Sequence, residues 1–481
     1  MPCWTRRQAV VAGGAVAAAP LRRAFARPDQ DRPRHWGGIN HGTGFFPDEP
    51  FLSTCIAAGR ELGLGAVRTR MNTIGGRHEG APFTWSRRDL AFDRYRDAGF
   101  QLHCILSFRE FVDRPALQEW QRNWRAFVRA VMSRYRDHVR VWIIDNEPEN
   151  PFGDYLPTPE ECVAFTRIAW EELHDLGLED RCRIESPPVE AIDSPFLDGL
   201  ISAGVANWCH VIGTHAYNDQ IEDRRIRRPW DLLAAGGIRD RPVAISEAGS
   251  IARWVPSGYP GGPARWRAVQ YRYLRLQAKA FGYDYCLAFD LDRWRQREDE
   301  WRVASFDDAG AGFTPVPLVW DNLRSAWTEE PGFSNGGFEE PEDGLGRWFV
   351  LHRVHDAALS ELRLVEFPRD SALARTGAGC CRMRPANEAL VVRQVADGLR
   401  PGRWYRVSAM VWSDGGDATL RAVGFERFDG LAECSQTVAE LGRWTEVAVD
   451  VRPSNPWLVV ELRGGVGGEH RWDDVEVVAL G

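Results

Sequence analysis

Lysine is almost absent from this sequence of 481 residues: Lys279 is the one lysine among 60 basic side chains, and the others are arginine. The arginines are scattered among 68 acidic residues instead of forming a basic stripe, and the formal net charge is -8. A nucleic-acid partner needs a basic surface that neutralises phosphates, so the sequence argues against one.

Long apolar runs are also missing, and no segment approaches the roughly 18 residues of a transmembrane helix. A short apolar run, Ala9–Ala19, follows Thr5-Arg6-Arg7 and precedes Ala24-Phe25-Ala26, a small-x-small cleavage pattern. This start resembles a bacterial twin-arginine signal peptide. We expect residues 1–26 to be a signal peptide and the protein to be exported, to the periplasm or the medium; a disordered basic N-terminus is the alternative.

No CxxC pair occurs among the 10 cysteines. Several cysteines fall inside apolar segments that look like core strands, namely Cys104, Cys182, Cys209 and Cys286. Although exported proteins commonly form disulfides, twin-arginine substrates fold before export in the reducing cytoplasm. We therefore expect buried free thiols, with the neighbouring Cys380 and Cys381 pointing to opposite faces of a strand.

Short apolar segments alternate with amphipathic ones from about residue 35 to 325, which favours a (β/α)8 barrel. The eight expected strands are near-continuous apolar runs, as in parallel strands buried on both faces. They are His35–Asn40, Ala66–Met71, Phe100–Ser107, Val139–Asp145, Arg181–Ser186, Cys209–Tyr217, Pro242–Glu247 and Tyr283–Asp290. A doubly wound open sheet is the alternative, but no GxGxxG or Walker-type loop supports it.

Two helices have clear signals. Apolar residues three and four apart give one face of the first: Leu117, Trp120, Trp124, Phe127 and Val131. The second opens with Thr158-Pro159-Glu160-Glu161, a capping box with proline at the first helical position. Its inward face is predicted to be Cys162, Phe165, Ala169, Leu173 and Leu176.

The pattern changes after Trp327. Residues 328–332 (Thr-Glu-Glu-Pro-Gly) form a predicted linker, and helical periodicity is absent beyond it. Alternating apolar residues indicate half-buried strands in 405–412, 447–451 and 458–462. Residues 27–327 are therefore predicted to be the barrel domain, and residues 333–481 an all-β sandwich of the jelly-roll type.

Polar side chains gather where the predicted strands end, at the edge of the barrel that carries active sites. Strand four ends in Asp145-Asn146-Glu147-Pro148, and strand seven ends in Glu247. Strand six ends in His215-Ala216-Tyr217, and strand two carries Arg68 and Arg70.

Two of these residues are suited to glycoside hydrolysis. Retaining hydrolysis of a glycosidic bond needs two carboxyl groups about 5–5.5 Å apart, one protonated to assist the leaving oxygen and one ionised to attack the anomeric carbon. Strands four and seven face each other across an eight-stranded barrel, so Glu147 and Glu247 can meet over its mouth. A nearby arginine and a tyrosine hydroxyl would keep the nucleophile ionised.

The ends of three predicted strands resemble clan A of the glycoside hydrolases, over roughly residues 35–327. These ends are Asn-Glu-Pro after strand four, His-x-Tyr in strand six and Glu in strand seven. The resemblance implies a retaining (β/α)8 enzyme with Glu147 as acid/base and Glu247 as nucleophile. Asn146 would contact the sugar hydroxyl next to the anomeric centre, Tyr217 would hydrogen-bond to the nucleophile, and His215 would line the sugar site.

The clan's Val-Arg on strand two matches Val67-Arg68, although Arg70 shares the same strand face and competes for the role. The Trp that often ends strand eight in the clan has no clear counterpart here. Phe289 or Trp294 would then supply the stacking face for the sugar. Asn40, at the end of strand one, is a further candidate for substrate binding.

Other carboxylates and histidines are alternatives to these residues. Glu185, at the end of strand five, is the main rival for a catalytic position, and Glu149 is interpreted as a loop acid. His103 and His210 are interpreted as packing residues, because no spacing indicates a metal site. Glu247 as a structural carboxylate, His215 as a core histidine and Arg68 as an ion-pair partner remain open alternatives.

The second domain resembles galactose-binding-like jelly rolls, among them carbohydrate-binding modules, on Asn335-Gly336-Gly337-Phe338-Glu339 near its start and Trp472-Asp473-Asp474-Val475 near its end. In such modules two acidic residues often share a structural calcium ion, and Glu339 and Asp473 are the matching positions. Trp412, Phe425 and Phe428 are predicted either to form a sugar-stacking face or to be core residues.

The sequence as a whole predicts a secreted retaining glycoside hydrolase that cleaves β-glycosidic bonds in a polysaccharide or oligosaccharide, with no organic cofactor. The alternatives are a non-catalytic carbohydrate-binding protein on the barrel scaffold and a polysaccharide lyase or transglycosylase. Fold-level analogy does not identify the sugar or the linkage.

Overall fold

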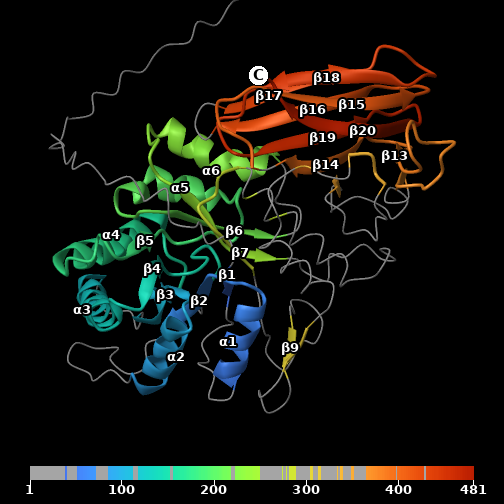
Figure 1. Ribbon diagram of the computed structural model, residues 1–481. Coiled ribbons are helices and arrows are strands. Elements are labelled where there is room, and N and C mark those ends of the chain that lie inside the picture. The colour runs from blue at the N-terminus through green and yellow to red at the C-terminus, as the bar shows by residue number, and fades with distance from the viewer. Residues whose placement is uncertain are drawn as a thin grey trace, which may run out of the picture. The chain divides into compact units, whose positions relative to one another are not determined.

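The computed structural model contains two bodies of secondary structure (Figure 1). Its described residues are 38–40, 51–71, 85–111, 117–151, 155–217, 223–249, 274, 278, 281–288, 304–306, 313–315, 333, 336–339, 348–351, 364–396, 398–426 and 430–481. The predicted signal peptide (1–26) and linker (328–332) lie outside these ranges.

The first body is a parallel eight-stranded sheet in the order β5-β4-β3-β2-β1-β8-β7-β6. A parallel bridge between Glu185 and Val211 joins β5 to the segment leading into β6, so the sheet closes on itself. The strands are β1 (Gly38–Asn40), β2 (Ala66–Met71), β3 (Gln101–Leu106), β4 (Val139–Ile144), β5 (Arg183–Glu185), β6 (Ile212–Tyr217), β7 (Val243–Gly249) and β8 (Cys286–Ala288). The predicted barrel is therefore confirmed, and each predicted strand overlaps an observed one.

Helices follow the first six strands in turn and lie around the outside of the sheet (Figure 1). They are α1 (Phe51–Glu61), α2 (Ser86–Asp97), α3 (Leu117–Tyr135), α4 (Pro159–Asp175), α5 (Pro195–Ser202) and α6 (Asp223–Ala235), with short 3-10 turns η1 (Phe108–Phe111) after β3 and η2 (Val205–Asn207) after α5. Each parallel connection needs such a crossover, and the apolar helix faces cover the strands.

The barrel buries its strands on both sides, which explains their continuous apolar sequences. Outward residues such as Trp142, Ile144 and Ile212 pack into the layer beneath the helices. Inward residues form a separate small cluster in the lumen: Ala66, Ile105, Val141, Ile143, Val211, Ala244, Tyr285 and Leu287. Because mostly apolar side chains fill this interior, a site open to substrate is expected where the strands end.

Both predicted helices are observed with their predicted faces. Trp120, Trp124, Phe127 and Val131 of α3 are all buried. The N-cap of α4 is Thr158, whose hydroxyl accepts from the Glu161 amide at 3.3 Å while the Glu161 carboxylate accepts from the Thr158 amide at 2.9 Å. This reciprocal pair is the predicted capping box, and it satisfies amides that would otherwise lack partners.

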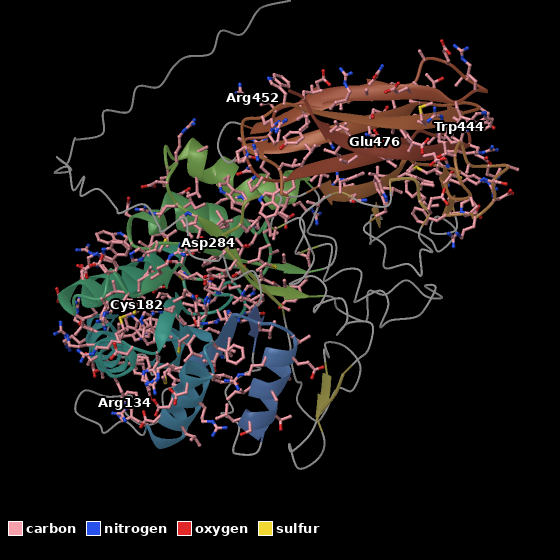
Figure 2. All side chains as sticks on the ribbon, viewed as in Figure 1. Arg134, Cys182, Asp284, Trp444, Arg452 and Glu476 are labelled. Atoms are coloured by element: carbon pink, nitrogen blue, oxygen red, sulfur yellow. The ribbon has the colours of Figure 1, made fainter. Side chains whose placement is uncertain are left out.

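The cysteines of the described residues form no disulfide: nine are free, and eight of these are buried. Cys182 (labelled in Figure 2) is one of the buried thiols. Burial raises the pKa of the Cys104 and Cys209 thiols to about 12, so neither is a reactive thiolate. No helix in the described ranges is both long and apolar enough to cross a bilayer.

The second body is a sandwich of two antiparallel five-stranded sheets, with a separate hairpin, β9 (Ala304–Phe306) and β10 (Phe313–Pro315), preceding it in the chain. One sheet is β11 (Phe349–Leu351), β14 (Leu390–Ala396), β19 (Leu458–Gly464), β16 (Ala418–Glu426) and β17 (Gly430–Thr437). The other is β12 (Val365–Glu366), β13 (Cys381–Met383), β20 (His470–Ala479), β15 (Tyr405–Ser413) and β18 (Thr445–Val451). Inward residues of both sheets, including Val407, Val449, Val460 and Trp472, share one core, so the predicted sandwich is confirmed.

Candidate active site

Six of the predicted site residues meet near the carboxyl ends of β2, β4, β6 and β7: Arg68, Asn146, Glu147, His215, Tyr217 and Glu247. Ligand atoms of Glu147, His215 and Glu247 all lie within 4.8 Å of one another. The two carboxylates, from the ends of β4 and β7, are therefore close enough to reach one bound atom.

Glu247 accepts hydrogen bonds from two neighbouring side chains. The Arg68 guanidinium donates to its Oε1, and the Tyr217 hydroxyl donates to its Oε2 at 2.6 Å. Burial alone would raise the pKa of Glu247, but the charges of His215 and Arg68 together with these hydrogen bonds outweigh it and hold the pKa well below the usual range. Glu247 is thus an ionised carboxylate at neutral pH.

Glu147 has different surroundings. Its Oε1 lies 2.7 Å from His215 Nδ1, and its Oε2 accepts from the Asn150 side-chain amide at 3.0 Å. Its side chain is 21% exposed, against 8% for Glu247. None of its partners among the described residues is a guanidinium. The two carboxylates therefore differ: Glu247 bonds to a buried arginine, whereas Glu147 bonds to none and is partly exposed.

His215 joins the two acids. It is fully buried, and its Nδ1 also lies 3.6 Å from Glu247 Oε2. Burial would lower the pKa of His215, yet the Glu247 charge and the hydrogen bond to Glu147 raise it above its ordinary value. The role as a sugar-lining residue stays a prediction, whereas its contact with both carboxylates is observed.

The two arginines of β2 are distinguished by their contacts. Arg68 is buried, bonds to Glu247 and donates to Asn146 Oδ1 at 2.5 Å. Arg70 is half-buried two residues further along the same face, and it acts on Asp145 only through its charge. Arg68 is therefore the arginine that supports the Glu247 carboxylate.

A β-bulge turns Glu247 toward the site. In β7, Ala244 points into the lumen and Ile245 outward, so strict alternation would point Glu247 outward as well. The pairing with β6 shifts between Thr214 and His215, and the pairing with β8 shifts over the same residues of β7. The extra residue, Ser246, restores the inward orientation that the site requires.

The turn after β4 adopts an unusual backbone. Asp145 and Glu147 have φ values of 62° and 47°, in the left-handed region that costs a non-glycine residue about 1–3 kcal/mol. Arg109, which sequence reasoning missed, forms an ion pair with Asp145 (Nε to Oδ2, 2.7 Å). Its position directly after β3 is the signal that could have identified it.

Two other carboxylates, Glu185 and Glu149, occupy structural positions. Glu185 lies fully buried on β5, and its carboxylate accepts from the Tyr285 hydroxyl. Burial raises the pKa of Glu185, despite its hydrogen bond to Tyr285. Glu149 accepts from the Glu190 amide (2.7 Å) and the Ser194 hydroxyl (3.1 Å), which ties its loop to the start of α5.

His103 and His210 also occupy packing positions. The His103 ring meets Tyr285 edge-on at 4.6 Å. His210 accepts from the Ile184 amide and stacks against Trp170. Burial lowers the pKa of His210 to about 3, so it is neutral.

The side chains of Asn40, Phe289 and Trp294 lie outside the described residues. Their predicted contacts with substrate stay predictions.

A divalent cation is the other ligand that Glu147, His215 and Glu247 could hold between them. However, the Arg68 guanidinium bonds to Glu247 and lies 3.4 Å from His215 Nε2. Its positive charge would oppose a cation at this position. The arrangement suits a reacting carboxylate pair better than a metal centre.

In the sandwich, Glu339 and Asp473 are engaged by the same loop. The Glu339 carboxylate accepts from the Ala378 and Gly379 amides, and Asp473 accepts from the Arg375 and Thr376 amides. These partners are donors, whereas calcium requires six to eight oxygen ligands. The calcium ion stays a prediction.

The residues of the predicted stacking face belong to different segments. Trp412 lies on β15, whereas Phe425 lies on β16 of the other sheet, and Phe428 is outside the described residues. The Arg471 guanidinium covers the Trp412 ring at 4.1 Å from its centroid. The sugar-stacking role of these aromatics stays a prediction.

Scans against protein-family models and a search of curated proteins give no match. Among solved structures, a GH39 β-xylosidase from Caulobacter crescentus is similar at 12% identity and a TM-score of 0.45, over 90% of this chain and 97% of that one. A GH5-4 broad-specificity endoglucanase from Clostridum cellulovorans is similar at 12% identity and a TM-score of 0.46, over 61% and 94%. TmCBM61, in complex with β-1,4-galactotriose, is similar at 18% identity and a TM-score of 0.23, over 32% and 97%.

Proposed function

We propose that the protein is a retaining glycoside hydrolase acting on β-linked sugars, with Glu247 as nucleophile and Glu147 as acid/base. The observation that carries this proposal is the spacing of the carboxylates, whose oxygens lie within 4.8 Å of each other. Inverting enzymes separate their carboxyl groups by about 6.5–9.5 Å to admit a water molecule, and retaining enzymes by about 5–5.5 Å. The observed spacing of the carboxylate oxygens favours the retaining arrangement.

The roles follow from the surroundings of each acid. Glu247 is kept ionised by Arg68, His215 and Tyr217, so it attacks the anomeric carbon. Glu147, which is more exposed and not paired with an arginine, delivers a proton to the leaving oxygen as the glycosidic bond breaks. The product of this step is a glycosyl ester on Glu247 and a free aglycone.

The second step reverses these roles. Glu147, now ionised, removes a proton from a water molecule that attacks the anomeric carbon. The ester bond to Glu247 breaks, the sugar leaves with its original configuration, and Glu147 is again protonated. No organic cofactor enters either step.

The experiment that tests the proposal uses a panel of aryl β-glycosides and polysaccharides with the wild type, Glu147→Ala and Glu247→Ala. Azide should rescue the first variant to a glycosyl azide of retained configuration and the second to one of inverted configuration. If both variants keep wild-type turnover, the assignment is wrong. An unsaturated sugar among the products would instead identify a lyase.

We also propose that the protein is exported by the twin-arginine route and that its sandwich supports action on polymeric carbohydrate. Replacing Arg6 and Arg7 by lysine should retain the precursor inside the cell. Deleting residues 333–481 should reduce activity on insoluble polysaccharide more than on an aryl glycoside, and an equal effect on both would leave the sandwich a structural role.

A further inference from the structure

The segment that carries Glu147 needs an external support. Asp145 and Glu147 are both left-handed, although neither is glycine, and the extended strand β4 ends directly before them. A free segment of this sequence would relax toward ordinary backbone angles and carry the Glu147 carboxyl away from Glu247. Contacts from another element must therefore hold the turn.

The Leu106 and Pro188 carbonyls accept from the Asp145 and Glu147 amides, and Arg109 adds side-chain contacts on both sides of Glu147. Its Nε pairs with Asp145 Oδ2 at 2.7 Å, one terminal nitrogen donates to the Asn146 carbonyl, and the other donates to the Asn150 carbonyl at 2.7 Å. All three guanidinium nitrogens thus reach the segment on both sides of Glu147. The ion pair is dry, since the Arg109 and Asp145 side chains are 5% and 0% exposed.

The support is itself anchored to the helical layer. Arg109 lies in η1, next to Phe108, whose ring stacks on Phe165 of α4 at 4.5 Å and whose carbonyl accepts from Trp120 of α3 at 3.0 Å. Buried aromatic packing therefore fixes the position of η1, and the contacts of Arg109 fix the turn relative to η1.

We propose that Arg109 is a positioning residue that holds Glu147 in place as the acid/base. This inference rests on the proposed function and extends it. Glu247 is held by residues of other elements, namely Arg68 from β2 and Tyr217 from β6. Loss of the Arg109 fork should therefore impair proton transfer by Glu147 while the nucleophile stays aligned.

Leaving groups provide the selective readout. A glycoside with a poor leaving group needs a proton from Glu147, whereas a dinitrophenyl glycoside leaves without one. For Arg109→Lys, which keeps the charge but loses the three-point fork, we expect kcat/KM on a methyl or methoxyphenyl glycoside to fall about 100-fold. Cleavage of the dinitrophenyl glycoside should change little, and azide should accelerate its turnover because azide needs no general base.

The matched control is Arg183→Lys. Arg183 pairs with Asp284 (labelled in Figure 2) at 2.5 Å, at the opposite end of the barrel strands. This variant should change both substrates by the same factor. Asp145→Asn, which removes the partner carboxylate but tolerates a left-handed backbone, should show the leaving-group signature if Arg109→Lys does not fold.

Equal losses on both substrates in Arg109→Lys, or in folded Asp145→Asn, would overturn the inference and assign Arg109 a purely structural role. The proposed function fails separately. If Glu147→Ala and Glu247→Ala retain activity, the proposed function and the positioning role are both wrong. If these two variants lose activity while the Arg109 variant keeps wild-type leaving-group dependence, only the positioning role is wrong.

Discussion

Replacing Tyr217 by phenylalanine tests how the site keeps its nucleophile ionised. The Tyr217 hydroxyl donates to Glu247 Oε2 at 2.6 Å in a buried position, so its removal costs one hydrogen bond to a charged group. Such a bond contributes about 1.5–3 kcal/mol, and one pKa unit corresponds to about 1.4 kcal/mol. The pKa of Glu247 should therefore rise by about 1–2 units.

The assay is the pH dependence of kcat/KM, whose acid limb reports the ionisation of the essential base in the free enzyme. Wild type should keep its activity to low pH, and the acid limb of Tyr217→Phe should move toward neutral pH by about 1–2 units. Tyr135→Phe removes a comparable bond, from Tyr135 to Asp89 at 3.0 Å on the helical layer, and should leave the limb unchanged. Superimposable acid limbs for wild type and folded Tyr217→Phe would refute this account of Glu247.

The same variant has a predicted effect on stability. The pKa of Glu247 is lower in the folded protein than its ordinary value, so this group stabilises the fold above its unfolded pKa and loses that contribution as the pH falls through the folded value. Tyr217→Phe should therefore lower the free energy of unfolding at neutral pH by about 1–3 kcal/mol, and the deficit should shrink on acidification. Chemical denaturation at several pH values measures it.

Other changes give independent checks. Thr158→Ala should cost about 1 kcal/mol of stability through loss of the capping box, with kcat/KM unchanged; a loss above 3 kcal/mol or altered kinetics would show a further role. Glu185→Gln should remove one pH dependence of the free energy of unfolding. Because the pKa of Glu185 is raised in the folded protein, the wild type loses stability as the pH rises from the unfolded pKa toward the folded pKa. The variant should not show this loss. A chelator should leave kcat unchanged if Glu147, His215 and Glu247 act without a metal ion, and the melting temperature of the sandwich should fall on chelation only if Glu339 and Asp473 hold calcium.

Much of the barrel is predictable because its signals are local. Continuous apolar runs identify strands buried on both faces, and the capping box at Thr158 marks the start of α4 at the observed residue. The list of polar strand ends follows from the rule that parallel strands end at one edge. That list includes Arg68, Glu147, His215, Tyr217 and Glu247.

The geometry within the site is not local, and sequence reasoning could not supply it. The bulge at Ser246 turns Glu247 inward, but it arises from pairing with two neighbouring strands and leaves no periodic signal. Whether Arg68 or Arg70 bonds to Glu247 depends on which of the two lies level with Glu247 in the folded barrel. The Arg109 contacts join residues 36 to 41 positions apart in the chain, and only the folded barrel brings them together.

The most direct test of the central claim is the configuration of the first product. Proton NMR recorded within the first turnovers on an aryl β-glycoside should show the β-anomer before mutarotation, since two displacements at one carbon, one by Glu247 and one by water, restore the starting configuration. An α-anomer as the first product would contradict the account, because a single displacement cannot pass through a covalent bond to Glu247.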